Sequence, residues 1–554
     1  MAVYYVDNTR PDDSGDGLTE DTAWKTVAKV TSTTFVAGDI IQFNAGQIWQ
    51  EELNVTDNGT LNNVVTFTAY GSGARPIFTD IKEVTDITDI GGGEWQGTGS
   101  AFRLQKNGTD LFLAIDETEW AMPETEFIQD GGTFRIKEDP AGNVYTMATT
   151  DIQATVSASS HLLFDGLEFQ GATNVTASII NSNNIEMNNC DIGYLAHAGL
   201  RLDGSSAIVI DGCTLDTGLT LYYGTWSATG GSWRGNADGI ETRNTLNDIT
   251  IINNQFKNWQ HGSIAFEDET LDGAVIMYNT TTSPDLSYGG RFVVNDDVTN
   301  LEMAYNKIIN TSVNTQLGGH GNHYHHNLFV GTKSSPLKPG NIGAGIAINP
   351  YDINYEDNIY ENNVFYDLDG PAISVEGWNT APPYVQNNIF RNNIGYNCGK
   401  EPMYSADYAM VYVTTWDDSL NNTFENNLMY SENSTTPYYH QSVGSVNAED
   451  FNLANGSNGD VISGNIDTYP NFVDLVHFML GDTSPAIGTG LLPLATHDYA
   501  GNSIVDGGVG SGYDMGLYNQ GFKGAIMTGM TEIGLGFSQA VLDDFRARAL
   551  AQYV

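Results

Sequence analysis

Two glutamates in successive repeat segments are the first candidates for chemistry. Glu241 lies in the segment 237–243 and Glu267 in the segment 262–269. Hydrolysis of a glycosidic bond with inversion uses two carboxyl groups roughly 6.5–9.5 Å apart, one protonating the leaving oxygen and one activating water. If the segments are neighbouring strands about 4.8 Å apart, offset by two residues, the two backbones lie roughly 8 Å apart. The pair predicts a hydrolytic site with Glu241 as acid and Glu267 as base.

Further charged residues extend this prediction. Asp238 would help Glu241 keep its proton through like-charge repulsion, and Arg243 should lie beside Glu267 and keep that carboxylate ionised. Asp296 and Asp297, one repeat further on, can replace either glutamate. Because the chain has 68 Asp and Glu residues, some must meet on an outer face by chance. The prediction is therefore a catalytic pair within residues 238–297.

A second set of residues could hold a carbohydrate. Aromatic faces suit the C–H faces of sugar rings, although each aromatic residue can equally be a packing residue. Guanidinium, imidazole and carboxylate groups can bond sugar hydroxyls. The predicted binding residues are Trp233, Trp259, Tyr288, Trp378, Arg243, Arg291, His323 and Glu376.

Four histidines, His320, His323, His325 and His326, form another cluster in the sequence. Since the adjacent pair falls inside a repeat, one of its members must point inward. No cysteine or Glu-x-x-His pattern accompanies them, so we do not expect zinc. His323 could instead carry protons in a groove. No cofactor is required, but the acidic runs 267–269 and 296–297 could hold Ca²⁺.

Two other function classes stay open. A polysaccharide lyase would abstract a proton beside a uronate, and Arg201, Arg243 and Arg291 occupy comparable repeat positions. Only 22 Lys and Arg residues in the chain, with no Lys at these positions, count against it. In a non-catalytic adhesin the same surface would only bind glycan.

The elements that must position these residues are repeats. From about residue 155 to 430, alternating apolar residues are followed by one or two Asn residues. These Asn residues are separated by roughly 20 to 35 residues, a period typical of solenoids. One coil cannot bury its apolar face, so the coils must stack. Asn suits one turn because it tolerates left-handed backbone and can form a hydrogen-bonded ladder. The positions are Asn254, Asn279, Asn306, Asn327, Asn363, Asn393 and Asn427.

A second strand follows each Asn segment. Its alternation predicts inward side chains at Ile240, Ile264, Phe292, Ile346 and Ile373. The residues one and three positions later should share one outer face; they are Glu241, Arg243, Glu267, Asn295, Asn349 and Glu376.

Both ends of the repeat region carry recognisable motifs. Near the N-terminus these are residues 4–7, 24–27, 37–43 and 65–77; near the C-terminus they are 484–490, 498–501 and 513–518. They resemble the pectate-lyase-like superfamily, whose fold is the right-handed parallel β-helix. The chain looks most like its phage tailspikes and related polysaccharide depolymerases. That resemblance implies a homotrimer and an extracellular location, on a virion tail or secreted, although fold does not select the chemistry.

Composition limits the partners. The formal net charge is −46, which repels phosphate backbones and anionic lipid and argues against nucleic-acid and membrane partners. Residues 1–7 enter a strand-like run directly and show no secretory signal. Cys190, Cys213 and Cys398 imply no disulfide framework.

The predicted organisation is all-β with a short C-terminal helical segment. Residues 1–80 form an N-terminal cap and the first coils, and 81–154 an insertion or β-rich layer beside them. The main parallel β-helix is 155–520. Residues 521–554 are a separate C-terminal segment, in which Ser538 caps a helix that runs to residue 550.

Overall fold

The computed structural model describes most of the chain in two compact units. The first unit comprises Met1–Thr270, Thr281–Phe292 and Pro336–Lys338, and the second comprises Leu271–Thr280, Val293–Ser335 and Pro339–Val554. The described residues are 1–99, 103–114, 126–218, 238–259, 261–266, 270–282, 291–295, 297–311, 315–332, 343–348, 354–376, 384–401, 408–414, 419–456, 459–499, 504 and 513–518.

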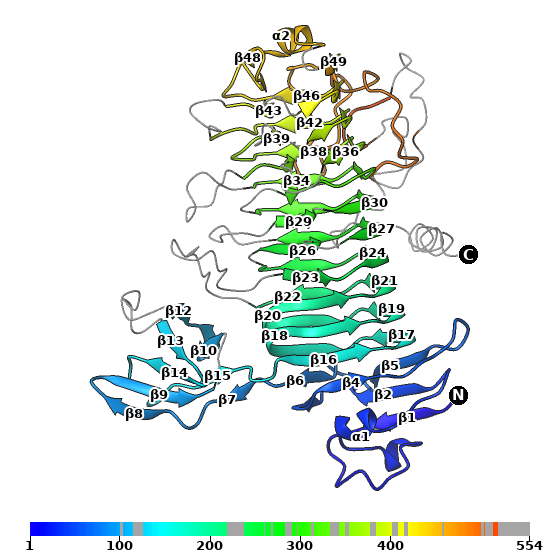
Figure 1. Ribbon diagram of the computed structural model, residues 1–554, viewed down its shortest axis with the longest axis vertical. Helices are drawn as coiled ribbons and strands as arrows, with labels where there is room; N and C mark the ends of the chain where they lie inside the picture. The colour runs from blue at the N-terminus through cyan, green and yellow to red at the C-terminus, as the bar shows by residue number, and fades with distance from the viewer. Residues whose placement is uncertain are drawn as a thin grey trace. The chain divides into compact units, whose positions relative to one another are not determined.

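The first unit consists of parallel β-helix coils (Figure 1). One sheet contains β1 (Val3–Val6), β2 (Ile40–Asn44), β5 (Val65–Tyr70), β17 (Ser160–Asp165), β19 (Asn183–Asn188), β21 (Ser206–Asp211) and β24 (Leu246–Ile252). Neighbours in this order pair in parallel. Ile185, Ile208 and Ile249 occupy one register position on three successive strands and are all buried. Period-two alternation thus builds a stack of identical apolar side chains inside the coils.

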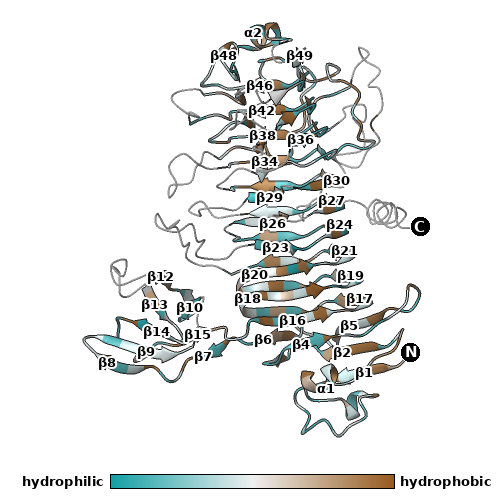
Figure 2. Ribbon diagram, in the orientation of Figure 1, coloured by the Kyte–Doolittle hydropathy of each residue, from teal (hydrophilic) through white to brown (hydrophobic). Residues whose placement is uncertain are grey.

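The other strands of these coils carry the predicted site. They are β3 (Ile48–Trp49), β4 (Leu53–Val55), β6 (Ile77–Thr79), β16 (Ile152–Ser157), β18 (Glu168–Ile180), β20 (Asp191–Asp203), β22 (Thr214–Asp216), β23 (Asp238–Arg243), β25 (Gln255–Lys257) and β26 (Gly262–Phe266). β16, β18, β20, β23 and β26 pair in parallel in that order. Brown, apolar residues recur on successive strands (Figure 2).

Short helices and aromatic rings cover the N-terminal end of the first unit. The helices are η1 (Glu20–Thr22) and α1 (Val27–Thr31), and the Thr26 side chain caps α1 by accepting a bond from the Lys29 N–H. The rings of Tyr4 and Trp24 stack with centroids 5.0 Å apart. This cap shields apolar side chains that have no preceding coil to contact.

Between residues 82 and 147 the described strands form two small, mainly antiparallel sheets beside the coils, in which only β12 and β13 pair in parallel (Figure 1). They are β7 (Lys82–Glu83), β8 (Thr88–Gly91), β9 (Glu94–Thr98), β10 (Leu104–Lys106), β11 (Thr109–Asp110), β12 (Phe112–Ala114), β13 (Glu126–Asp130), β14 (Thr133–Ile136) and β15 (Tyr145–Met147). The layer has its own apolar core, which includes Phe127 and Phe134. Arg103 pairs with Asp110 at 2.9 Å and donates to the Thr217 carbonyl at 2.8 Å, which ties the layer to a coil.

The second unit repeats the coil architecture. Its first sheet contains β27 (Leu271–Met277), β30 (Val298–Ala304), β33 (His323–His325), β37 (Ile359–Glu361), β41 (Ile389–Arg391), β45 (Thr423–Glu425) and β49 (Val461–Ser463). A second run contains β31 (Lys307–Ile309), β34 (Leu328–Val330), β38 (Val364–Tyr366), β42 (Ile394–Tyr396) and β46 (Leu428–Tyr430). α2 (Ala448–Leu453) precedes β49 in the chain.

Two shorter runs complete the coils of the second unit. One contains β32 (Thr315–Gln316), β35 (Ile346–Ile348), β39 (Ile373–Glu376), β43 (Val411–Thr414), β47 (Tyr438–His440) and β48 (Gly444–Val446); β47 and β48 pair antiparallel. The other contains β36 (Tyr355–Glu356), β40 (Val385–Gln386) and β44 (Ser419–Leu420). β28 (Thr280–Thr282) and β29 (Arg291–Asn295) each contain residues of both units.

The predicted Asn ladder is present in the second unit. The N–H of each Asn donates to the side-chain oxygen of the Asn one coil later, at 2.9–3.2 Å, from Asn279 through Asn306, Asn327, Asn363, Asn393 and Asn427 to Asn465. The left-handed position is one residue earlier in each coil: Asn362, Asn392 and Asn426 have φ of 55°, 57° and 52°. The ladder prediction is confirmed, and its assignment of left-handed backbone to the ladder Asn itself is wrong.

A second Asn ladder runs five residues before the first. The N–H groups of Asn322, Asn358 and Asn388 donate to the side-chain oxygens of Asn358, Asn388 and Asn422 at 2.9–3.1 Å. In the first unit, Cys213 stands in a ladder position, where its N–H donates to Asn254 Oδ1 at 2.8 Å. Side chains that accept a backbone N–H from the preceding coil therefore recur at fixed positions in both units.

The strand pairing confirms the predicted fold, a right-handed parallel β-helix. Two predicted inward stacks, Ile240 on Ile264 and Ile346 on Ile373, are in register. The predicted helix capped by Ser538 lies outside the described residues. Within the described part of the chain, we find no helix with the length and apolarity needed to cross a membrane.

Candidate functional site

Glu241 lies among three polar side chains of the first unit. β20 and β23 pair so that Arg201 is directly opposite Glu241 and Asp203 is opposite Arg243. Arg201 Nε lies 2.5 Å from Glu241 Oε1, and Arg201 Nη2 donates to Asn174 Oδ1 at 3.0 Å. Arg243 Nη2 lies 3.9 Å from the same Glu241 oxygen. The result is a carboxylate between two guanidinium groups on adjacent coils.

The ion pair of Arg201 and Glu241 is largely shielded from solvent. The Arg201 and Glu241 side chains are only 8% and 16% exposed, so their pairing is poorly screened by water. The Arg201 guanidinium holds the Glu241 carboxylate in one orientation by a charge-assisted hydrogen bond. The role of Glu241 as the acid stays a prediction.

Asp238, the predicted like-charge neighbour of Glu241, has a histidine partner. Its Oδ1 lies 3.0 Å from Nδ1 of His261, and both residues are buried. A buried carboxylate at one ring nitrogen fixes the tautomer and orientation of an imidazole. His261 was missed in the sequence, because it stands directly before β26 and is brought to Asp238 only by the register that places Asp238 opposite Gly262.

Several predicted site residues lie outside the described residues: Glu267, Asp296, Trp233, Tyr288 and Trp378. Glu241 lies opposite Ala265 in β26, as the predicted register requires, so the placement of Glu267 beside Arg243 stays a prediction. Asp297 is half-buried, and its carbonyl accepts the Leu271 N–H at 3.1 Å. Arg291 begins β29, and its N–H donates to the His261 carbonyl at 3.3 Å.

Two predicted binding residues are inside the protein. Trp259 is 1% exposed, and its indole N–H donates to the Leu215 carbonyl at 3.0 Å. The ring lies so close to Gly193 and Gly239 that a Cβ there would contact it at 2.9–3.0 Å. Trp259 therefore has no face open to a sugar. The expectation that Glu376 lies on an open outer face is also wrong, because it is buried and accepts the Ser374 hydroxyl at 2.6 Å.

His323 belongs to a network in the second unit. His323 Nε2 lies 2.8 Å from Glu361 Oε1, and the Arg391 guanidinium lies 2.8 Å from Glu361 Oε2. The N–H of Leu494 also donates to Glu361 at 2.8 Å. Burial alone would raise the pKa of Glu361, but the hydrogen bond from His323 and the charges of His323 and Arg391 lower the pKa to about 2. Glu361 is thus an ionised, fully bonded carboxylate.

Two more histidines of the predicted cluster, His325 and His326, are buried beside this network, whereas His320 is partly exposed and pairs with Glu356 at 3.3 Å. His325 Nδ1 and His326 Nδ1 lie 3.0 Å apart, and His325 Nε2 lies 3.1 Å from Glu302 Oε1. Burial and the neighbouring histidine charge lower the pKa of both rings, so both are neutral imidazoles near neutral pH. The sequence predicted that one of His325 and His326 points inward, and in the structure both are buried.

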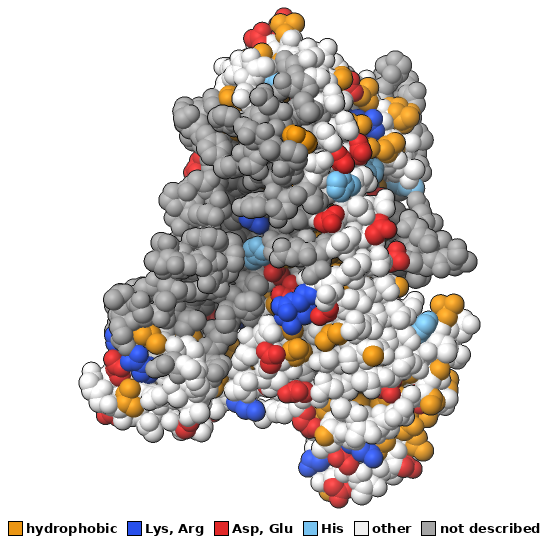
Figure 3. Space-filling view, viewed as in Figure 1, with side chains coloured by type: hydrophobic (Ala, Val, Ile, Leu, Met, Phe, Trp, Pro, Cys, Tyr) orange, Lys and Arg blue, Asp and Glu red, His pale blue; other side chains and the backbone are white. Residues whose placement is uncertain are grey.

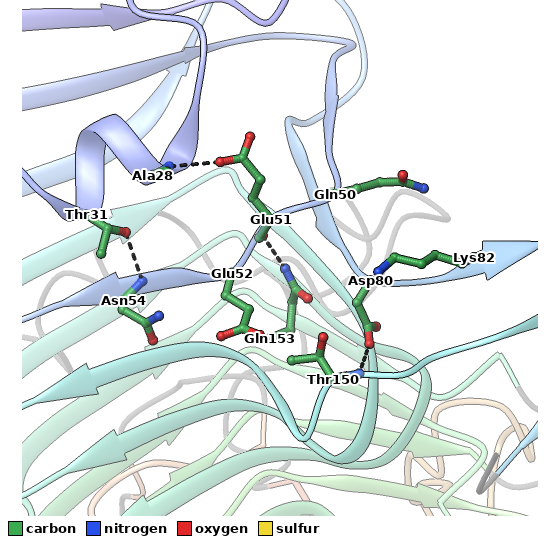
Figure 4. Close-up of a pocket in the computed structure, with 10 residues that line it drawn as sticks. All are labelled: Ala28, Thr31, Gln50, Glu51, Glu52, Asn54, Asp80, Lys82, Thr150 and Gln153. Atoms are coloured by element: carbon green, nitrogen blue, oxygen red, sulfur yellow. Dashed lines mark hydrogen bonds between the residues drawn. The ribbon is translucent and has the colours of Figure 1, made fainter. Parts of the chain in front are cut away.

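A pocket of about 390 Å³ lies near the N-terminal cap of the first unit. Figure 4 shows Glu51 reaching the N–H of Ala28, with the Gln153 amide donating to the Glu51 carbonyl and Asp80 accepting from Thr150. Its described lining residues are mostly polar, and none of them is aromatic. It lacks the ring-stacking surface expected of a main sugar-binding site.

The protein that carries this site is a right-handed parallel β-helix. No protein-family model matches the chain, and no curated protein matches it. Similar solved structures include the GH136 lacto-N-biosidase from Eubacterium ramulus, at 13% identity over 78% of this chain and 64% of that chain, with a TM-score of 0.44. This chain therefore spans less than two thirds of the lacto-N-biosidase.

Two further solved structures are similar to this chain. For pectate lyase Pel9A the identity is 12%, over 94% of this chain and 96% of that chain, with a TM-score of 0.40. For the Dettilon tailspike protein the identity is 11%, over 84% of this chain and 66% of that chain, with a TM-score of 0.41.

Proposed function

We propose that this protein binds an extracellular polysaccharide and cleaves its glycosidic bonds, with the site at Glu241 on the coils of the first unit. The observation that carries the proposal is the ion-paired group of Arg201, Glu241 and Arg243 on adjacent strands. Charged side chains on successive coils, repeated every 4.8 Å or so, suit a linear polymer of hydroxyl-rich units. The net charge of −46 fits a carbohydrate better than a phosphate polymer.

The proposed reaction is hydrolysis by two carboxyl groups, with the roles of the glutamates exchanged. Glu241, held by Arg201 and Arg243, takes the proton of the attacking water. Glu267, predicted two residues further along the next strand and beside Arg243, protonates the leaving oxygen. Substrate binding must draw Arg243 away from both carboxyl groups, because a guanidinium disfavours the protonated form of a neighbouring carboxyl.

A polysaccharide lyase is the second candidate, and the two guanidinium groups favour it. β-Elimination next to a uronate requires its carboxylate to be neutralised, which Arg201 or Arg243 can do. His261, oriented by Asp238, would then take the proton beside that carboxylate. A non-catalytic adhesin that only binds glycan is the third candidate function.

The finer features of the proposal follow from the sequence resemblance. They are endo-acting cleavage of a bacterial or marine surface polysaccharide, a homotrimeric assembly, and location on a virion tail or in the secreted fraction. The chain has 68 Asp and Glu residues against 22 Lys and Arg residues, and Figure 3 shows red acidic side chains spread over the described part of one face. Such a surface resists non-specific association.

The test is incubation with a panel of capsular and marine polysaccharides, following new reducing ends and the ultraviolet absorbance of unsaturated products together. Reducing ends without absorbance support hydrolysis. A rise in absorbance contradicts the two-carboxylate mechanism and supports elimination. Binding of a polymer, by affinity electrophoresis, without either product supports the adhesin.

A further inference from the structure

We propose that Glu302, His323 and His325 form a binding site for a divalent transition-metal ion such as zinc. The proposal concerns the second unit and is independent of the glycan reaction. It revises the expectation drawn from sequence motifs, which looked for ligands close together in the chain. Here the third ligand comes from the preceding coil.

The strand register brings the three side chains together. β30 and β33 pair so that Glu302 lies opposite His323 and Ala304 lies opposite His325. His323 and His325 are two residues apart on one strand, so their side chains share a face, with ring centroids 4.1 Å apart. One ligand atom from each of the three residues lies within 4.8 Å of the others. Among the described residues, this is the one group of three His, Cys, Asp or Glu side chains that meets this criterion.

His323 has the outer partner that a metal-binding imidazole needs. Ligating histidines commonly give their second N–H to a carboxylate, which fixes the tautomer and orientation of the ring. Glu361 occupies that position at 2.8 Å from His323 Nε2. Glu361 is fully buried and held in turn by Arg391 and the Leu494 N–H. With its proton on Nε2, His323 presents Nδ1 as a lone-pair donor.

His325 has an equivalent support. Its Nδ1 lies 3.0 Å from Nδ1 of His326, which leaves Nε2 directed at Glu302 Oε1, 3.1 Å away. His325 is 1% exposed and therefore fixed, whereas the Glu302 side chain is 44% exposed and can adjust. A metal ion between these two atoms would replace the proton that they share.

The donor set selects the class of metal. Two imidazoles and one carboxylate suit zinc and neighbouring transition metals, whereas Ca²⁺ takes six to eight oxygen ligands. Metal–ligand distances of about 2.0–2.2 Å in a tetrahedral site place the ligand atoms roughly 3.4 Å apart. His325 Nε2 and Glu302 Oε1 are already 3.1 Å apart, and no two of the ligand atoms are more than 4.8 Å apart, so movement of Glu302 can bring the group to this geometry. Three protein ligands leave the fourth position for water or another group.

The competing interpretation is a purely structural network. Glu361 and Arg391 fasten the segment around Leu494 to the coils, and that role needs no metal. The structural interpretation predicts that the protein binds no metal through Glu302. The two interpretations thus differ in one measurable property.

The test uses the full chain after dialysis against EDTA. Co²⁺ is added while visible d–d absorption is followed, and Zn²⁺ binding is measured by calorimetry. We expect one ion per chain, with the intense absorption of a tetrahedral Co²⁺ site that Zn²⁺ abolishes. Glu302→Gln and His323→Gln should each weaken binding at least about tenfold. His320→Gln is the matched control, because His320 pairs with Glu356 outside the group, and it should bind as the wild type does.

Folding is checked separately by circular dichroism, and Glu302→Gln is the more conservative variant because its side chain is partly exposed. Absence of Co²⁺ and Zn²⁺ binding by the wild type would overturn the proposal. So would binding that folded Glu302→Gln and His323→Gln both retain unchanged. Equal affinity for Ca²⁺ would contradict the assignment to the transition-metal class.

Discussion

Glu168, in β18, illustrates how the surroundings of one carboxyl group affect stability. Burial, the largest influence, and the charge of Asp191 raise its pKa, while the hydrogen bond from Gln170 and the charge of Arg75 lower it; the net effect is a raised pKa. A raised folded-state pKa means that the folded protein binds the proton more tightly than the unfolded chain does. The stabilisation is fully present below the unfolded pKa of about 4.3 and is lost as pH rises through the folded pKa.

We therefore expect Glu168→Gln to stabilise the protein at pH 7, where Glu168 carries an unfavourable charge. The gain should be no more than about 1 kcal/mol, because Glu168 is partly exposed and solvent screens its interactions. Thermal melts of both proteins at pH 7 and near pH 4 measure it. The advantage should shrink toward pH 4; an advantage that grows on acidification would contradict the raised pKa.

Individual site residues were only partly predictable from the sequence. The repeat register correctly placed Ile240 on Ile264, and with it Glu241 on the strand beside β26. It did not reveal that Arg201 pairs with the Glu241 carboxylate, because Arg201 is 40 residues earlier in the chain and the lengths of the coils vary. Trp259 was wrongly predicted to bind sugar, because indole rings occur both in apolar cores and in sugar-binding sites. Its burial depends on glycines from other coils, which only the folded structure aligns.

At the scale of elements, the Asn ladders hold successive coils in register. Asn363 is fully buried; its Oδ1 accepts from the N–H and the amide of Asn327 at 3.0 and 3.1 Å, and its Nδ2 donates to the Tyr324 carbonyl at 3.0 Å. The sequence predicted the ladder from the repeated Asn. It did not reveal that the left-handed residue precedes each ladder Asn, since Asn occupies both positions in several coils.

Asn363→Ala should lower the free energy of unfolding by about 2–5 kcal/mol, because it leaves more than one buried polar group without its partner. Asn433→Ala, at an exposed position in the same unit, should change it by less than about 0.5 kcal/mol. Urea unfolding followed by circular dichroism compares the two. Equal effects would show that the ladder contributes nothing specific.

Glu361 connects strand β37 to the segment around Leu494. Removing one partner of a buried ion pair leaves the other charge uncompensated, at a cost of about 3–5 kcal/mol. We expect Glu361→Gln to destabilise the protein by this amount and to make the 491–497 segment exchange backbone hydrogen faster. Glu425→Gln, at the partly exposed register position two strands later, is the control. Unchanged exchange in 491–497 would contradict the fastening role.

At the scale of the whole molecule, charge is the dominant feature. A net charge of −46 over 554 residues makes self-repulsion an unfavourable contribution to the folded state. Added salt screens that repulsion, because the Debye length falls from about 30 Å at 0.01 M to about 3 Å at 1 M. We therefore expect the thermal midpoint to rise steadily with NaCl concentration. A midpoint that falls with NaCl would mean that attractive ion pairs outweigh the repulsion.

The class of fold was predictable at this scale, because periodic Asn and alternating apolar residues repeat through the chain. The chemistry was less predictable from the sequence, because a parallel β-helix supports many reactions and the fold does not select among them. The proposed reaction therefore depends on one group of side chains around Glu241.

The most direct test of the proposed site is Glu241→Gln assayed on the polysaccharide that the wild type cleaves. Gln keeps the size of the side chain and its hydrogen bond to Arg201 but cannot take a proton. We expect the rate of cleavage to fall about 10²- to 10⁴-fold, as for loss of a general base, while binding by affinity electrophoresis is retained. Glu425→Gln should cleave at the wild-type rate. Wild-type cleavage by Glu241→Gln would contradict the proposed site.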